Sequence, residues 1–221
     1  MKNIRIAMIF ALCSPFLVTS AEGQMGPQIP TPKGIFNPVV GSGAQYEVER
    51  KDGSKTTFEI AIVGKESAEG KDAFWLEASA DTPRMGTMVM KELIVVDGNT
   101  SHITRMVMLM PGRGPMELPV GMGARMSATQ PPEDIRSKAD DLGSESVTVP
   151  AGTFTCEHYR GKNNDGDAWV SKDVPPYGLV KMTDKDKEQT VVLTKTEKSF
   201  QDKITGAPAP FNPMMLGRPQ P

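Results

Sequence analysis

Short segments of alternating polar and apolar residues, separated by turn residues, fill most of residues 41–200, and this pattern restricts the fold more than any other feature. One segment places Phe58, Ile60 and Ile62 on a single face, and the Asp-Gly pair at 52–53 just before it is typical of a tight hairpin turn. No amphipathic helical pattern separates successive segments. Neighbouring strands should therefore run antiparallel and be joined by short turns.

We expect an all-β domain, built as a strongly curved antiparallel sheet or an unclosed half-barrel. At most one short helix is predicted, near residues 132–142, because Pro131 and Pro132 precede this stretch and Gly143 follows it. The predicted strands are residues 46–50, 57–63, 73–80, 88–96, 102–110, 145–149, 152–160, 167–171, 178–182 and 189–197.

Residues 1–21 are typical of a secretory signal peptide. Lys2 and Arg5 supply a short basic segment, and a mostly apolar run follows as far as Val18. The small residues Thr19 and Ala21 favour cleavage near Ala21. No other stretch is apolar and long enough to cross a bilayer, so we expect a periplasmic or secreted protein without an integral membrane span in the mature chain.

Proline and glycine divide the remaining chain into three regions. Residues 22–40 contain too many of both for a helix or a central strand, and they predict a flexible leader. Residues 206–221 are rich in proline and predict a disordered tail. The antiparallel β domain is therefore expected to span residues 41–205.

The composition excludes several classes of function. The chain has two histidines and two cysteines, so it is poor in the side chains on which catalysis and metal binding most often depend. Removing the signal peptide leaves Cys156 as the single thiol, which cannot form an intramolecular disulfide. A formal net charge of −2 does not fit a nucleic-acid-binding protein with a dominant basic field. We expect a protein that is not an enzyme and that carries no cofactor.

Methionine is concentrated in the centre of the sequence. Of the 15 methionines, six lie between residues 106 and 126. In the strand predicted at 102–110, Val107 and Leu109 face away from the methionines, so both faces are apolar and both need to be covered. The candidate ligand-binding residues are the methionines of this strand, of its predicted hairpin partner and of the following loop: Met88, Met90, Met106, Met108, Met110 and Met116.

Three interpretations of these methionines remain open at this stage. In the first, the loop at 111–130 folds back as a lid and the thioethers fill gaps in an ordinary core. In the second, they line an apolar groove that holds an acyl chain or an apolar peptide face. In the third, they bind copper(I), because soft thioether sulfur selects this ion.

Cys156 and His158 also raise a catalytic hypothesis, that of a thiol with a neighbouring base. Two residues along a strand separate the backbones by about 6.6 Å with parallel side chains, which does not favour a hydrogen bond between them. We therefore expect Phe154, Cys156 and His158 to form one inward stripe and to have no catalytic role.

The second half of the chain resembles exported bacterial domains of unknown function, which are similar to outer-membrane lipoprotein carriers of the LolA/LolB type. The resemblance rests on residues 147–154, Cys156, residues 158–160, 167–171 and 174–182. It implies an unclosed antiparallel β-barrel around a hydrophobic cavity, with Phe154 and Trp169 in the sheet. Those carriers place helices inside the half-barrel, whereas this sequence has a Met-rich loop in the corresponding place.

The resulting prediction is a non-catalytic periplasmic protein that holds an apolar ligand, either an acyl chain or a lipidated protein, on a Met-rich concave surface. The main alternative is a structural or interaction module of the cell envelope that engages a partner protein. Periplasmic copper(I) binding is a minor alternative.

Overall fold

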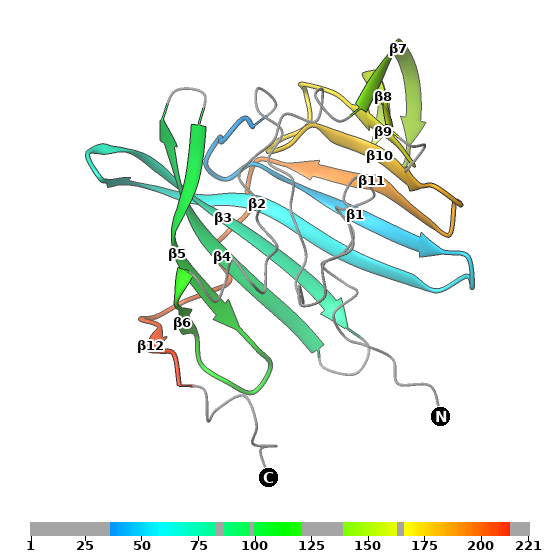
Figure 1. Cartoon of the computed structure of the whole chain (residues 1–221). Coiled ribbons are helices and arrows are strands. Elements are labelled where there is room, and N and C mark those ends of the chain that lie inside the picture. The colour runs from blue at the N-terminus through cyan, green and yellow to red at the C-terminus, as the bar shows by residue number, and fades with distance from the viewer. Residues whose placement is uncertain (1–35, 83–85, 98–99, 121–138, 163–165, 213–221) are drawn as a thin grey trace.

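In the described residues, the domain is a single curved sheet of twelve strands (Figure 1). The structure is a computed structural model, and it describes residues 36–82, 86–97, 100–120, 139–162 and 166–212. The predicted all-β fold and the unclosed sheet are confirmed. The strands are β1 (Gly43–Arg50), β2 (Lys55–Ala68), β3 (Lys71–Thr82), β4 (Gly86–Asp97), β5 (Thr100–Leu109), β6 (Met116–Leu118), β7 (Ala139–Val149), β8 (Gly152–Gly161), β9 (Gly166–Val170), β10 (Leu179–Asp184), β11 (Gln189–Glu197) and β12 (Ala209–Pro210).

Two antiparallel meanders meet in the middle of the sheet. One runs from β1 to β6 and the other from β7 to β11, and the last strand of the second meander pairs with β1. The strand order is β12-β6-β5-β4-β3-β2-β1-β11-β10-β9-β8-β7. Short turns between neighbouring strands explain the order inside each meander, where each strand pairs with the one that follows it along the chain.

The end of the sheet formed by β7 to β11 is strongly rolled. The tip of the β7–β8 hairpin reaches back over two strands, where the amide of Ala151 donates a hydrogen bond of 3.3 Å to the carbonyl of Leu193 on β11. Val149, at the same tip, packs in one hydrophobic cluster with Val191 and Leu193. This closure buries an apolar core inside the bend without closing the sheet into a barrel.

All ten predicted strands are present, and most extend a few residues beyond their predicted limits. The structure differs at residues 139–144, which belong to β7 and overlap the end of the predicted helix at 132–142, while residues 121–138 lie outside the described residues. The alternation that predicts a strand is weak in this part of β7, because its side chains are almost all exposed.

The C-terminal segment is ordered further than its proline content predicts. We call residues 199–212 the C-terminal strap. We expected disorder from residue 206, but Ala209–Pro210 form β12, which pairs in parallel with β6, and the amide of Ala209 donates a hydrogen bond of 2.9 Å to the carbonyl of Pro115. An edge position explains this, since a proline at the sheet edge removes no ladder hydrogen bond. Residues 213–221 lie outside the described residues.

Candidate functional site

The two faces of the sheet can be followed from strand to strand, because directly paired residues share a face. One face carries two rows of paired residues, and both rows start on β1. We call it the inner face. One row leads towards the β6 edge and the other towards β8. The first consists of Ala44, Ile60, Ala78, Met90, Met108 and Met116, and the second of Val48, Val191, Met182, Ala168 and Tyr159.

Four of the six predicted ligand-binding methionines lie together at the β6 end of the inner face. Met106 is completely buried, and Met90, Met108 and Met116 have exposed fractions of 4–8%. They pack with Leu118 into one hydrophobic cluster, which we call the Met cluster. The predicted proximity of these side chains is therefore confirmed, and in the described structure they are packed as core.

The remaining two predicted residues lie at the rim of this region. Met88 on β4 and Met110, just after β5, are both partly exposed, and Met110 packs against the Met cluster. Whether any of the six binds a ligand stays a prediction. Met122 and Met126, which follow in the same loop, lie outside the described residues.

Both faces of β5 are covered, as its two-sided apolar pattern predicts. On the inner face the cover includes Phe211 of the C-terminal strap, which packs against the Met cluster. On the outer face Ile204, also in the strap, is buried against Val89 and Val107. The loop at 111–130 contributes β6, which extends the sheet at its edge and adds Met116 and Leu118 to the cluster. Within the described residues the loop thus adds a strand. The lid of the first interpretation stays a prediction, because residues 121–130 lie outside the described residues.

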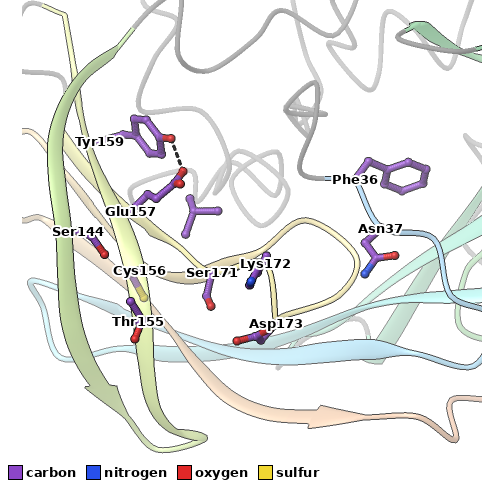
Figure 2. A pocket seen from close by; sticks show the side chains of 11 residues that line it. Phe36, Asn37, Ser144, Thr155, Cys156, Glu157, Tyr159, Ser171, Lys172 and Asp173 are labelled. Atoms are coloured by element: carbon purple, nitrogen blue, oxygen red, sulfur yellow. Dashed lines mark hydrogen bonds between the residues drawn. The ribbon is translucent and has the colours of Figure 1, made fainter.

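A pocket of about 640 Å³ lies at the other end of the inner face (Figure 2). It is bounded by β8, by the segment after β9 and by the residues that precede β1. Its walls combine aromatic and aliphatic groups with charged and hydroxyl groups. The described lining residues are Phe36, Asn37, Ser144, Thr155, Cys156, Glu157, Tyr159, Val170, Ser171, Lys172 and Asp173.

Backbone contacts hold the N-terminal wall of this pocket. The amide of Asn37 donates a hydrogen bond of 2.9 Å to the carbonyl of Pro176, and the ring of Phe36 lies 5.3 Å from that of Tyr177. Tyr177 is itself buried in the core of the inner face. Sequence reasoning assigned residues 36–40 to a flexible leader and therefore missed this wall, because the contacts that fix it come from a segment about 140 residues away.

The polar groups of the pocket include one thiol and one paired carboxylate. Burial raises the pKa of the Cys156 thiol to about 11, and the charge of Glu145 adds to this shift. The Tyr159 hydroxyl donates a hydrogen bond of 2.5 Å to Glu157. A thiol with so high a pKa is almost entirely protonated at neutral pH, so Cys156 is a poor nucleophile and metal ligand.

His158 does not act on Cys156. The Cys156 thiol lies 3.7 Å from the carbonyl oxygen of Phe154, while both ring nitrogens of His158 face carboxylates, with Nδ1 at 3.0 Å from Glu145 and Nε2 at 2.9 Å from Asp167. The expectation that the two residues do not form a catalytic pair is consistent with this geometry. The expected common stripe is not present, because Cys156 is buried in the core and His158 stacks on Trp169.

Each half of the outer face carries one tryptophan with a similar set of neighbours. Trp75 donates a hydrogen bond of 3.0 Å to Glu66, and Lys91 and Arg105 lie 4.8 and 5.2 Å from its ring. The Trp169 indole donates a hydrogen bond of 2.5 Å to Glu145. Its ring stacks on His158 at 4.4 Å and lies 4.9 Å from the Lys181 ammonium.

Burial by itself would raise the pKa of Asp167, but hydrogen bonds from His158 and Arg160 hold it below its usual value.

In the described part of the chain, no three histidine, cysteine, aspartate or glutamate side chains are grouped so that they could hold a metal ion. The same residues contain no helix with the length and hydropathy of a membrane span.

Comparison with known proteins yields similarities of structure alone. No protein-family profile matches the chain, and no curated protein matches its sequence. An exported protein of Bacteroides fragilis with a YmcC-like fold is 14% identical, with 73% of this chain and 97% of that chain covered and a TM-score of 0.37. MucB, in the MucA/MucB complex of Pseudomonas aeruginosa, is 14% identical, with 70% and 50% covered and a TM-score of 0.36.

A further structure of MucB, in complex with the periplasmic part of MucA, is also 14% identical, with 80% of this chain and 54% of that chain covered and a TM-score of 0.34. The chain thus spans about half the length of the MucB chains. At TM-scores of 0.34–0.37, these similarities carry neither a family nor a function over to this chain.

Proposed function

We propose that this protein is a non-catalytic binding module of the cell envelope, which holds an acyl chain or the lipidated part of another protein in the pocket on its inner face. The observation that supports this proposal is the pocket itself. Its volume of about 640 Å³ lies within the range of roughly 300–1,000 Å³ that is usual for small-molecule sites. The location in the envelope rests on the predicted signal peptide.

The lining of the pocket favours an amphipathic ligand. Phe36, Tyr159 and Val170 offer apolar surface, while Lys172 and Asp173 are exposed and polar. An acyl chain would lie against the apolar groups, and its polar end would remain among the charged groups. The predicted Met-rich surface offers less room for such a ligand, because the Met cluster is filled by its own side chains and by Phe211.

A pair of substitutions on one strand tests this site. Thr155 lines the pocket, and Thr153 lies on the same strand outside it. We expect the Thr155→Trp side chain to fill the pocket and to weaken the binding of a fluorescent fatty acid by about tenfold or more, which corresponds to about 1.4 kcal/mol. Thr153→Trp, the matched control, should bind like the wild type.

Native mass spectrometry after gentle purification provides the second measurement, because a co-purified lipid should appear as added mass on the wild-type protein. A clean apo mass together with no binding of the fluorescent fatty acid would reject the proposal. Equal binding by Thr155→Trp and the wild type would reject the pocket as the site.

One observation favours the alternative of an interaction module. β7 lies at the end of the sheet, and residues 140–146 on it are exposed. An edge strand can pair with an extended segment of a partner protein. Asp140, Asp141 and Glu145 make this strand acidic, so a basic partner segment fits it best. A partner that is lost from pull-downs when Asp140 and Asp141 are changed to Lys would support this alternative.

Copper(I) binding remains the minor alternative. Changing Met106, Met108 and Met110 to Leu preserves approximate volume and removes the sulfur atoms. A Cu(I) titration that gives the same affinity for this triple variant and for the wild type would eliminate these residues as a site.

A further inference from the structure

We propose that the C-terminal strap is a pH-dependent cover of the Met cluster, which is held in place while a carboxyl group beneath it is protonated and loosens when that proton is lost. This inference is independent of the proposed ligand pocket, which lies at the other end of the sheet.

The strap crosses the outer face of the sheet and is fixed there by polar contacts. The amide of Phe200 donates a hydrogen bond of 2.9 Å to the carbonyl of Gly41, just before β1. Lys203 then contacts Glu59 through its ammonium group, which also donates a hydrogen bond of 2.6 Å to Ser79. Asp202 forms an ion pair with Lys91 on β4.

Glu77 lies under the strap and is almost completely buried, with an exposed fraction of 4%. Its carboxyl oxygens accept hydrogen bonds of 3.1 and 3.4 Å from the backbone amide of Lys203. The residues paired with it are Ala61 on β2 and Lys91 on β4. Because Ala61 is small and apolar, the polar groups that act on this carboxyl are Lys203 and Asp202 of the strap.

The charges around Glu77 do not balance unless one proton is bound. The acidic groups facing this region are Glu59 on β2, Glu77 on β3 and Asp202 in the strap, and the basic groups are Lys91 on β4 and Lys203 in the strap. Three carboxylates against two ammonium groups leave one negative charge, and a single bound proton removes it. An unbalanced charge in a buried site is costly, so the strap is held best when the group is neutral.

The proton belongs on Glu77. Burial raises the pKa of Glu77 to about 7, the hydrogen bond from the Lys203 amide opposes this shift, and the charge of Asp202 adds to it. Burial acts in the same direction on Glu59, but hydrogen bonds and charge from Lys203 hold the pKa of Glu59 below its usual value. A carboxyl group with a raised pKa stabilises the folded contact below its ordinary pKa, and this contribution is lost as the pH rises through about 7.

Loosening of the strap would uncover the methionines. Ile204 of the strap packs against Val89 and Val107 on the outer face. Phe211 packs against the Met cluster on the inner face, so the strap wraps around the β6 edge. Within the described part of the strap, only the two residues of β12 pair with β6 at that edge. The unbalanced charge that ionisation of Glu77 leaves beneath the strap therefore weakens its attachment upstream of a weakly held end.

Methionine oxidation by hydrogen peroxide measures this opening, because the thioether has no proton to lose and its oxidation depends on access. The rates at Met106, Met108 and Met116 are followed by peptide mass spectrometry and divided by the rate of free N-acetylmethionine in the same reaction. In the wild type we expect these ratios to rise by about threefold or more between about pH 6 and about pH 8.5.

Glu77→Gln keeps the shape of the protonated side chain without the ionisation, so its ratios should stay low across the whole range. Asp202→Asn should also reduce the rise, because it removes the repelling charge. Glu188→Gln is the matched control: Glu188 pairs with Lys51 at an exposed site outside the strap, and this variant should behave like the wild type.

A wild-type ratio that does not change with pH, or a rise that persists undiminished in Glu77→Gln, would overturn the proposal. If Glu77→Gln fails to fold, as judged by its thermal unfolding, Asp202→Asn decides the question, and an undiminished rise in that variant would overturn the proposal in the same way.

Discussion

Rows of paired residues lead to both ends of the inner face, but one end is covered and the other is open. The row that leads to the β6 edge ends in the Met cluster, which Phe211 of the strap covers. The row that leads to β8 ends at Tyr159, on the wall of an open pocket. The difference comes from where the chain goes after β11: it leaves the centre of the sheet and crosses β2, β3 and β4, so the strap covers the β6 end.

The alternating pattern of the strands is similar at both ends, so it does not determine which end is filled by core and which end keeps a pocket. The Met-rich part of the sheet becomes core because another segment of the same chain is long enough to reach it. The less apolar end keeps a pocket, because the segments that reach it, Phe36 and residues 171–173, bring polar groups and leave space.

Substitution of Met106 should produce the largest difference between the two ends. Met106 is completely buried, so Met106→Ala should lower the free energy of unfolding by about 2–5 kcal/mol, because a cavity is left in the core. Thr155→Ala at the pocket should change it by about 0.5 kcal/mol or less. Denaturant unfolding of both variants measures this contrast.

The control for this experiment is Met106→Leu, which keeps most of the volume and should cost less than about 1.5 kcal/mol. Equal losses for Met106→Ala and Thr155→Ala would contradict the distinction between a filled end and an open end.

The pH dependence of stability should come mainly from the strap. Because burial raises the pKa of Glu77 to about 7, the wild type should lose stability as the pH rises through that value. The expected loss is on the order of 1 kcal/mol between about pH 6 and about pH 8.5. Thermal unfolding at a series of pH values measures it, and Glu77→Gln should give a flatter profile. A wild-type Tm that is constant over this range would contradict the expected loss.

Removal of the aromatic side chain from the strap should have an effect no larger than this one. Phe211 is only partly buried, so Phe211→Ala should lower the free energy of unfolding by about 1 kcal/mol, less than full burial of a phenylalanine would contribute. The same variant should raise the oxidation rate of the Met cluster at every pH. An oxidation rate equal to that of the wild type would show that Phe211 is not part of the cover.

The smallest effect is expected at the pocket thiol. Because burial raises the pKa of Cys156 to about 11, about one molecule in a thousand carries the thiolate at pH 8, and reaction with a disulfide reagent should be correspondingly slow. A colorimetric thiol assay in the native and the denatured state measures the difference. Rapid labelling of the native protein would show that the pocket exposes a reactive thiolate.

The sequence predicts those parts of the molecule that depend on local pattern. Alternation places each strand, and the two-sided apolar character of residues 106–109 correctly requires cover on both faces of β5. The source of the cover could not be predicted, because Ile204 and Phe211 come from about 100 residues further along the chain and follow no periodic pattern.

The pocket and the buried carboxyl are harder to predict for the same reason. Phe36 and Asn37 lie in a proline-rich segment whose composition predicts a flexible chain, and contacts with Pro176 and Tyr177 override that local preference. Glu77 occupies the polar position of an alternating strand, where a solvated side chain is the usual expectation. Its burial results from the strap that lies above it.

The two tryptophans give this protein an intrinsic reporter at each end. The sequence contains only these two, and Trp75 contacts Lys91, the strand residue that pairs with Asp202 of the strap, while Trp169 stacks on His158 at the rolled end. With either tryptophan replaced by phenylalanine, the emission of the other follows one end alone. Opening of the strap and events at the rolled end near the pocket thus become separately observable in the two single-tryptophan variants, without any attached dye.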